Sequence, residues 1–231
     1  MDNSLLALLD EHTPLSPIQR QYFSPVAQGH YHYQLNQQEV GIQEPWQILE
    51  NDQVSIIRSV RYVKDQAIAL AVVNHTTSVA QTIDIHFKPC DGADVLAQYS
   101  VTGDGHWHVS QRHCGDLFKY SGHVRNGAVY PLLRVFTGNM LQHCQSKDDQ
   151  PCPVLLPDIR VQASGNNKLK PHIDWRYSRC VEETEKGRKF TCSSQHYDEG
   201  NAHFYVNQDN ILDFYQWQQD EAQLWQVQLR S

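Results

Sequence analysis

Apolar and polar residues alternate along most of this chain with a period of two, the pattern of strands that bury one face. In the stretch GHYHYQL, Tyr31 and Tyr33 fall on one face, and His30 and His32 on the other. Turn-forming residues interrupt the alternation at intervals of roughly eight to twelve positions, as expected of an antiparallel meander. We therefore expect about a dozen strands and an all-β protein.

Two segments have a helical period instead. Residues 3–11, NSLLALLDE, predict a short N-terminal helix with Asn3 or Ser4 as its cap. Residues 130–144, YPLLRVFTGNMLQHC, predict a second helix, because Pro131 suits a first helical turn and apolar residues follow at helical spacings. The apolar face of this helix needs a surface to cover. We expect it to cover the open end or concave face of a curved sheet.

The order of these elements indicates the domain organisation. We expect residues 1–24 to form an N-terminal helix and lead-in, and residues 25–231 to form a single antiparallel β-roll domain with the helix at 130–144 inserted. A meander of this length must curl to bury one face. The expected architecture is therefore a curved β-roll or barrel-like sheet.

Charge and hydropathy narrow the classes of partner. The 231 residues include 19 basic and 26 acidic ones, a formal net charge of -7, and no run of Lys or Arg that would neutralise a row of phosphates, which argues against nucleic acid. No apolar run reaches the roughly 18 residues that a membrane-spanning helix requires. Because the N-terminus also lacks the basic start and long apolar core of a signal peptide, we expect a cytoplasmic protein.

The six cysteines are expected to be free thiols, because the cytoplasm keeps such thiols reduced. The pair that would form a disulfide in an exported protein is Cys180 with Cys192. These residues flank VEETEKGRKFT, and a hairpin that turns near Gly187 would bring their strands side by side. Directly opposed residues on such strands are close enough for a disulfide.

An antiparallel roll with 10% aromatic residues either fills its interior with side chains or leaves room for a small ligand. We expect a ligand, which makes the protein a non-catalytic binder of a lipid, a glycolipid or another apolar small molecule, without a cofactor. Replacing Trp107 or Trp175 by Ala should then weaken binding. The candidate ligand-binding residues are Tyr31, Tyr33, Tyr99, Trp107, Arg134, Trp175, Arg176 and Trp217, and Trp46 is expected on the same buried face.

The segment IDWRYSR has two faces of different character. Alternation puts Asp174 and Arg176 on one face and Trp175 and Tyr177 on the other. A buried Arg176 paired with Asp174 would suit an anionic head group. We expect instead that the pair faces solvent and that Trp175 faces the interior.

The stretch GDGHWHVSQRHC offers an alternative function. His106 and His108 share one face of a strand and could be two ligands of one metal in a metal-dependent enzyme. Arg112 shares that face, however, and the chain has no CxxC pair, HExxH helix, nucleophile elbow, P-loop or dinucleotide turn. We therefore favour a protein without enzymatic activity, with Trp107 in the core and the histidines at a polar surface. A protein-interaction scaffold is a third possibility.

Three segments are similar to known bacterial families. GHYHYQLNQQEVGIQEPWQI resembles the opening of bacterial proteins of unknown function with a lipoprotein-carrier or spiral β-roll architecture. AHFYVNQDNILDFYQW resembles the end of a bacterial glycolipid-binding family, and GDGHW resembles a strand turn of that family through Asp104, Gly105 and Trp107. Asn210 stands where that family tends to have Gly, and its TNT-x-P-x-R segment has no clear equivalent here. The resemblance implies a curved antiparallel roll and, by analogy, a lipid-like ligand.

Overall fold

The computed structural model describes residues 1–145, 150–159, 168–194 and 202–230. Its strands form one sheet in which every pairing is antiparallel except that of β9 with β10. This confirms the prediction of an all-β protein built as an antiparallel meander. The strands are β1 (Ser24–Leu35), β2 (Gln38–Glu50), β3 (Ser55–Val63), β4 (Ile68–Thr76), β5 (Ala80–Lys88), β6 (Val95–Thr102), β7 (His106–His113), β8 (Asp116–His123), β9 (Ala128–Val129), β10 (Cys152–Pro157), β11 (Pro171–Thr184), β12 (Gly187–Ser194), β13 (Ala202–Val206), β14 (Leu212–Asp220) and β15 (Gln223–Arg230).

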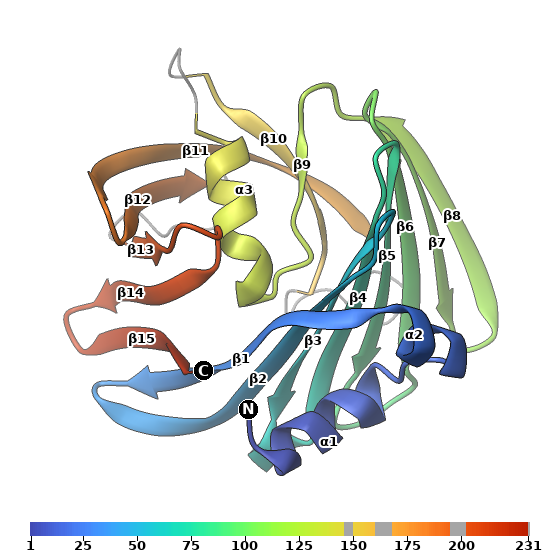
Figure 1. Cartoon of the computed structure of the whole chain (residues 1–231), viewed down its shortest axis with the longest axis horizontal. Helices are drawn as coiled ribbons and strands as arrows, with labels where there is room; N and C mark the ends of the chain where they lie inside the picture. The colour runs from blue at the N-terminus through green and yellow to red at the C-terminus, as the bar shows by residue number, and fades with distance from the viewer. Residues whose placement is uncertain (146–149, 160–167, 195–201, 231) are drawn as a thin grey trace.

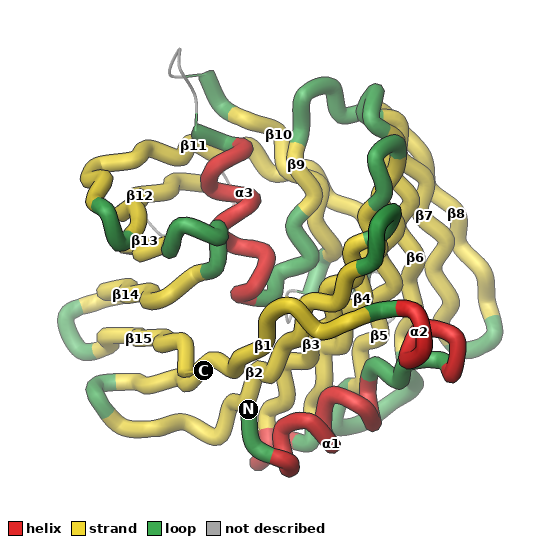
Figure 2. The backbone as a smooth tube through the Cα atoms, in the orientation of Figure 1, coloured by secondary structure: helices red, strands yellow, loops and turns green. Residues whose placement is uncertain are grey.

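The sheet is strongly curved and its first and last strands are neighbours. Strand β1 pairs with both β2 and β15, so the two edges of the sheet are β8 and β9. Figures 1 and 2 show β3 to β8 as one long wall and β10 to β15 as a second wall that faces it. Helix α3 lies in the space between the two walls (Figure 1). The result is the curved, barrel-like sheet that the sequence predicted.

The turn between β1 and β2 shows how local sequence sets the register. Asn36 and Gln37 have φ angles of 51° and 66°, the conformation of a two-residue turn that matches the twist of its strands. Asn36 also donates to the carbonyl of Ala222 at 2.7 Å and accepts from the backbone N–H of Leu224 at 2.8 Å. This residue therefore ties the first hairpin to the last one.

The helices differ in part from the predictions. The predicted N-terminal helix is present as α1 (Asn3–His12), but its cap is Asp2, whose carboxylate accepts from the backbone N–H groups of Ser4 and Leu5. Helix α2 (Pro17–Tyr22) was not predicted. The predicted helix at 130–144 is shorter than expected. In this segment the chain is not helical before Arg134, forms one 3-10 turn over Arg134–Phe136, and is α-helical only as α3 (Thr137–His143). No helix among the described residues is long and apolar enough to cross a membrane.

Residues 132–144, here called the plug, fill much of the space inside the sheet. Leu133 and Leu141 are completely buried in one core that includes residues of both walls. Gly138 lies so close to the turn between β13 and β14 that a Cβ atom there would overlap the carbonyl oxygen of Asn210. Glycine is therefore required for this approach of helix to turn.

The outer face of β3 and β4 is covered by α1. Leu9 is completely buried against Val60 of β3 and Ala69 and Ala71 of β4. Strand β4 therefore has an apolar cluster on each face, because Leu70 points to the opposite side and belongs to the interior core.

Arg58 of β3 is the polar anchor of this contact. Its guanidinium donates to Asp10 of α1 at 2.6 Å, to the carbonyl of Thr13 at 3.0 Å and to Gln47 of β2 at 2.8 Å. The side chain is 3% exposed. A buried guanidinium with its donors satisfied holds the end of α1 to the sheet in one orientation.

Cys180 and Cys192, the pair considered for an exported protein, lie on neighbouring strands but not in directly opposed positions. Register places Cys180 opposite Phe190 and Cys192 opposite Ser178. All six cysteines are present as thiols and not as disulfides.

Replacing Arg58 by Met should lower the free energy of unfolding by about 3 kcal/mol, because Asp10 and Gln47 lose a buried partner. Urea unfolding followed by fluorescence measures this change. The matched control is Arg20→Met, since Arg20 approaches the same Asp10 only at 3.8 Å and is 56% exposed. That variant should lose less than about 0.5 kcal/mol. Equal losses in both variants would contradict an anchoring role for Arg58.

Candidate functional site

A cleft opens at one rim of the barrel, between the sheet and the plug. Its volume is about 340 Å³. The sheet contributes the β4–β5 turn (76–81) and the end of β6 with its turn (101–103), and the other side is formed by residues 127–129 and by α3. The cleft is therefore made by hairpin ends that are far apart in the sequence. We call it the rim cleft.

The rim cleft has an apolar floor and a polar edge that includes the imidazole of His143. Ala128 and Met140 are buried at its floor, with Val101 half-buried beside them. The edge carries side-chain hydroxyl and amide groups from Thr76, Thr77, Ser78, Gln81, Thr102 and Asn139. None of the described residues that line the cleft is Asp, Glu, Lys or Arg.

Hydrogen bonds hold part of this edge in place. Gln81 donates to the side-chain oxygen of Asn74 at 2.9 Å, and Asn74 donates to the hydroxyl of Thr76 at 3.2 Å. Asn74 is 3% exposed, so its amide is fixed by its neighbours rather than by solvent. The polar edge is thus arranged before any ligand arrives.

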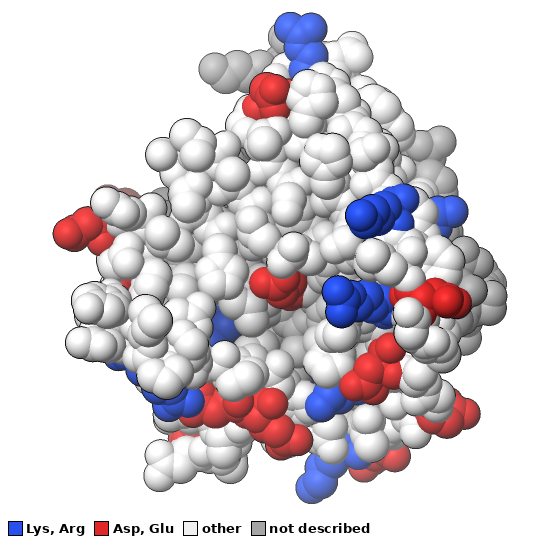
Figure 3. Space-filling view, turned by 90° about the vertical axis from the view of Figure 1, so that its right-hand side faces the viewer, with Lys and Arg blue, Asp and Glu red and all other residues white. Residues whose placement is uncertain are grey.

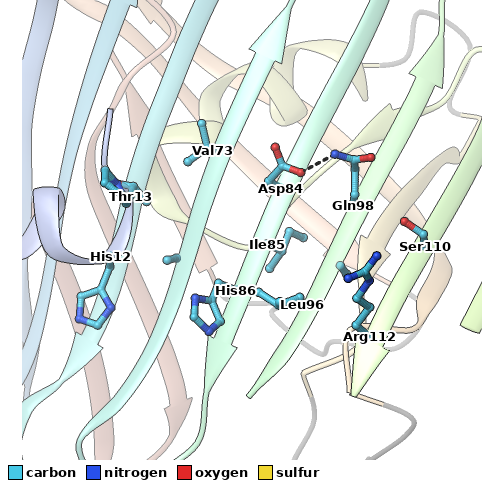
Figure 4. A pocket seen from close by; sticks show the side chains of 13 residues that line it. His12, Thr13, Val73, Asp84, Ile85, His86, Leu96, Gln98, Ser110 and Arg112 are labelled. Carbon is cyan, nitrogen blue, oxygen red and sulfur yellow. Dashed lines mark hydrogen bonds between the residues drawn. The ribbon is translucent and has the colours of Figure 1, made fainter. Parts of the chain in front are cut away.

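A second hollow lies on the outside of the sheet. This outer groove, with a volume of about 410 Å³, crosses β4 to β7 beside the end of α1. Figure 4 shows Asp84 and Gln98 in its middle, with Arg112 toward one end and His12 toward the other. On the outer face seen in Figure 3, basic and acidic side chains are interspersed without a large patch of either sign.

The charged groups of the outer groove are partly paired with neighbours. Asp84 accepts from Gln98 at 2.8 Å, and His86 lies 2.7 Å from Asp94. Charges of both signs line an open surface, so the groove selects neither an anion nor a cation strongly. The rim cleft, with its apolar floor and uniform polar edge, is the more selective of the two hollows.

The centre of the barrel is occupied by side chains. Tyr99 is completely buried there, and its hydroxyl donates to the carbonyl of Leu169 at 2.7 Å. Leu169 is itself 0% exposed and belongs to the same core as the plug. The large aromatic residues that were predicted to line the interior of the roll therefore mainly pack against other side chains of the hydrophobic core.

The structure brings three of the predicted ligand-binding residues into one region. Tyr31 and Tyr33 are buried on the inner face of β1, and Arg134 enters from the plug with its guanidinium 4.1 Å from the centre of the Tyr215 ring. Trp107 is buried on β7 and Trp217 is half-buried on β14. Of these residues, none lines the rim cleft.

Glu44 of β2 connects this region to the sheet. It is 0% exposed and accepts from the Tyr33 hydroxyl at 2.5 Å, from Arg61 of β3 at 2.7 Å and from the backbone N–H of Arg134. Arg61 also donates to the carbonyl of Leu132 at 2.9 Å. Leu132 has a φ of 68°, which is unusual for a residue with a side chain, so this bond supports a strained entry into the plug.

Burial and the charges of the network fix its protonation state. Burial raises the pKa of Tyr33, so the hydroxyl remains a donor to Glu44. Burial opposes the charge on Arg61, but the combined attraction of Glu44 and the neighbouring tyrosine hydroxyls outweighs it and raises the pKa of the guanidinium. Neither Glu44 nor Arg61 was among the residues predicted for a site. The available signal was that Glu44 shares a face with Trp46, a residue predicted to be buried.

The predictions for Trp175 and Arg176 were wrong in orientation. Trp175 is 44% exposed, whereas Asp174 and Arg176 are 0% and 5% exposed. The buried ion pair, at 2.8 Å, is satisfied by Ser194, which donates to Asp174 at 2.6 Å, and by the Tyr130 ring 5.3 Å from the guanidinium carbon. Burial is tolerated because these contacts replace water.

His106 and His108 are exposed on the outer face, and Trp107 between them is buried, as predicted. His106 lies 3.0 Å from a carboxylate oxygen of Asp104. In the described ranges, no group of three or more His, Cys, Asp or Glu side chains is placed to hold a metal ion. The geometry therefore gives the metal-enzyme alternative no support.

His30 and His32 form a close pair on the outer face of β1, with their Nε2 atoms 2.6 Å apart. Burial lowers the pKa of both rings; the positive charge of His32 adds to this effect on His30, and that of Arg230 adds to it on His32. The unfolded chain therefore binds more protons than the folded one below about pH 6.5. Stability is lost as the pH falls through this range.

Replacing Glu44 by Gln should lower the free energy of unfolding by about 3 kcal/mol, because Arg61 would keep its buried charge without a counter-charge. Chemical unfolding measures the change. Glu39→Gln is the control. Glu39 is 64% exposed and lies 3.6 Å from His32 of β1, so it should contribute less than about 1 kcal/mol to the free energy of unfolding. If the two variants were equally stable, the network would not be a principal anchor of the plug.

Replacing both His30 and His32 by Gln should reduce the loss of stability between about pH 7 and pH 5, since the groups that gain protons on unfolding are removed. Urea unfolding at several pH values in this range measures the slope. His108→Gln serves as the control, because His108 is exposed and should leave the slope unchanged. An unaltered slope in the double variant would exclude the pair as its source.

Comparisons with known proteins add one structural likeness. No protein-family model matches the chain, and no curated protein matches it. Among solved structures, it is similar to a β-barrel-like protein of the domain of unknown function DUF1849 from Brucella abortus, with 9% sequence identity and a TM-score of 0.39. The match covers 90% of this chain and 98% of that one. The function is therefore inferred from the chain's own residues.

Proposed function

We propose that this protein binds a small amphiphilic molecule, with an uncharged head group that carries hydroxyls, in the rim cleft. The ligand class follows the expectation of a lipid, glycolipid or other apolar molecule, but the site moves from the centre of the roll to its rim. The reason is that the plug and Leu169 occupy the centre.

The size and position of the cleft support this function. A volume of about 340 Å³ lies within the range of small-molecule sites, although near its lower end. The cleft admits a short alkyl chain or one end of a longer one. Met140 suits such a floor, because its flexible thioether adapts to irregular apolar ligands.

The polar edge supports an uncharged head group. Hydroxyl and amide side chains both donate and accept hydrogen bonds, so they match the hydroxyls of a sugar or glycerol. An anionic head group would lose its hydration on binding, and the edge of the cleft offers it no Lys or Arg in exchange, so its binding would be unfavourable. The observation that carries the proposal is this combination of an apolar floor with an edge that holds no Asp, Glu, Lys or Arg among its described residues.

Octyl glucoside below its micelle concentration should bind the wild-type protein with one site by calorimetry, and octyl sulfate should bind less tightly. Val101→Trp should weaken octyl glucoside binding about tenfold or more, a loss of roughly 1.4 kcal/mol, because the indole would fill the cleft. Chemical-shift changes at Ala128 and Met140 would locate the ligand.

Two variants control for nonspecific effects. Leu117→Trp places an indole on the edge strand β8 at a residue that is 50% exposed, and it should leave affinity unchanged. Trp175→Ala removes an exposed outer residue and should do the same. Equal affinity in wild type and in a folded Val101→Trp protein would overturn the proposal.

A further inference from the structure

Three of the six cysteines meet where α3 ends against the second wall of the barrel. The carbonyl of Cys144 accepts from the backbone N–H of Ser178 on β11 at 3.4 Å. Cys192 of β12 is directly opposite Ser178, and Cys152 of β10 is directly opposite Arg176. Directly opposed residues of antiparallel strands project to the same face, and Ser178 and Arg176 share the buried face. The pairing therefore directs all three thiols toward the end of α3.

Within this cluster, Cys144 and Cys152 are paired and differ in their access to solvent. The Cys152 thiol lies 3.8 Å from the carbonyl oxygen of Asn126, and His143, the neighbour of Cys144 in the chain, contacts the same oxygen at 3.2 Å. The two thiols are close enough to interact directly. Cys144 is 1% exposed, whereas Cys152 is only half-buried. A small oxidant can therefore reach Cys152 while Cys144 stays shielded behind it.

The local electrostatics assign different roles to the two thiols. The interaction with Cys144, together with the backbone N–H of Ala128, lowers the pKa of Cys152. The same interaction and burial raise the pKa of Cys144. Thiolates, not thiols, react with peroxides, so the more accessible residue of the pair is also the more nucleophilic one.

We propose that Cys152 is a peroxide-reactive residue and that Cys144 is its resolving partner, so that a hydroperoxide converts the pair into a disulfide. This activity is independent of ligand binding in the rim cleft.

Two balanced steps are required. The Cys152 thiolate attacks one oxygen of hydrogen peroxide; the O–O bond breaks, the leaving hydroxide takes up a proton to become water, and Cys152 becomes a sulfenic acid. The sulfur of Cys144 then attacks the Cys152 sulfur. The S–O bond breaks, the oxygen leaves as water with the thiol proton, and the S–S bond forms. One peroxide is reduced, two thiols are oxidised and two waters are released.

The first experiment uses the full-length, reduced wild-type protein and hydrogen peroxide. After a short exposure, free thiols are blocked with N-ethylmaleimide and the protein is digested without reductant for mass spectrometry. We expect a Cys144–Cys152 disulfide within one chain, with Cys152 oxidised about tenfold faster than Cys90 or Cys114. Cys90 and Cys114 are matched controls, because both are exposed. A hydrogen bond to Asp91 also raises the pKa of the Cys90 thiol.

A variant separates the two steps. In Cys144→Ser, Cys152 should stop at the sulfenic acid and be labelled there by dimedone, whereas in Cys152→Ser the remaining cysteines should show no rapid oxidation. Oxidation of Cys90 or Cys114 before Cys152 in the wild-type protein would overturn the proposal, whether or not the variants fold. A Cys152–Cys192 disulfide in place of Cys144–Cys152 would overturn the assignment of the resolving partner.

Discussion

The buried carboxylate of Glu44 on β2 joins the side chains of two neighbouring strands to the backbone of the plug. It accepts from Tyr33 of β1, from Arg61 of β3 and from the backbone of Arg134 in the plug. A buried charge of this kind is costly unless every lone pair finds a donor, so the network tolerates little displacement of its members. The position of the plug, and with it the shape of the rim cleft, depends on this constraint.

A filled centre and an open rim have the same cause. The sheet is long enough to enclose a wide interior, and the plug and Leu169 fill it with leucine and aromatic side chains. Close packing requires the plug to fit both walls at once, which Gly138 permits by its approach to Asn210. At the rim, the hairpin turns and α3 leave the space that forms the rim cleft. The rim cleft is therefore a consequence of how a curved sheet accommodates an inserted segment.

The amount of the site that could be predicted differs from residue to residue. Alternation correctly assigned Tyr31 and Trp107 to the core and His106 to the surface. In β11 the same rule separated Trp175 from Arg176 but assigned them to the wrong sides. Periodicity divides a strand into two faces, and only the neighbours decide which face is buried. Here the buried face holds Asp174, Ser194 and Tyr130, and these residues satisfy Arg176 better than solvent-facing positions would.

The sequence by itself determined the fold class, the N-terminal helix and the tight turn at Asn36, because each follows from residues that are close in the chain. The tertiary structure alone decided the length of α3, the partners of Glu44 and the convergence of Cys144 with Cys152. The rim cleft belongs to the second group as well. Its lining comes from four segments that are far apart in the sequence. They become neighbours only through the pairing of the strands and the path of the plug.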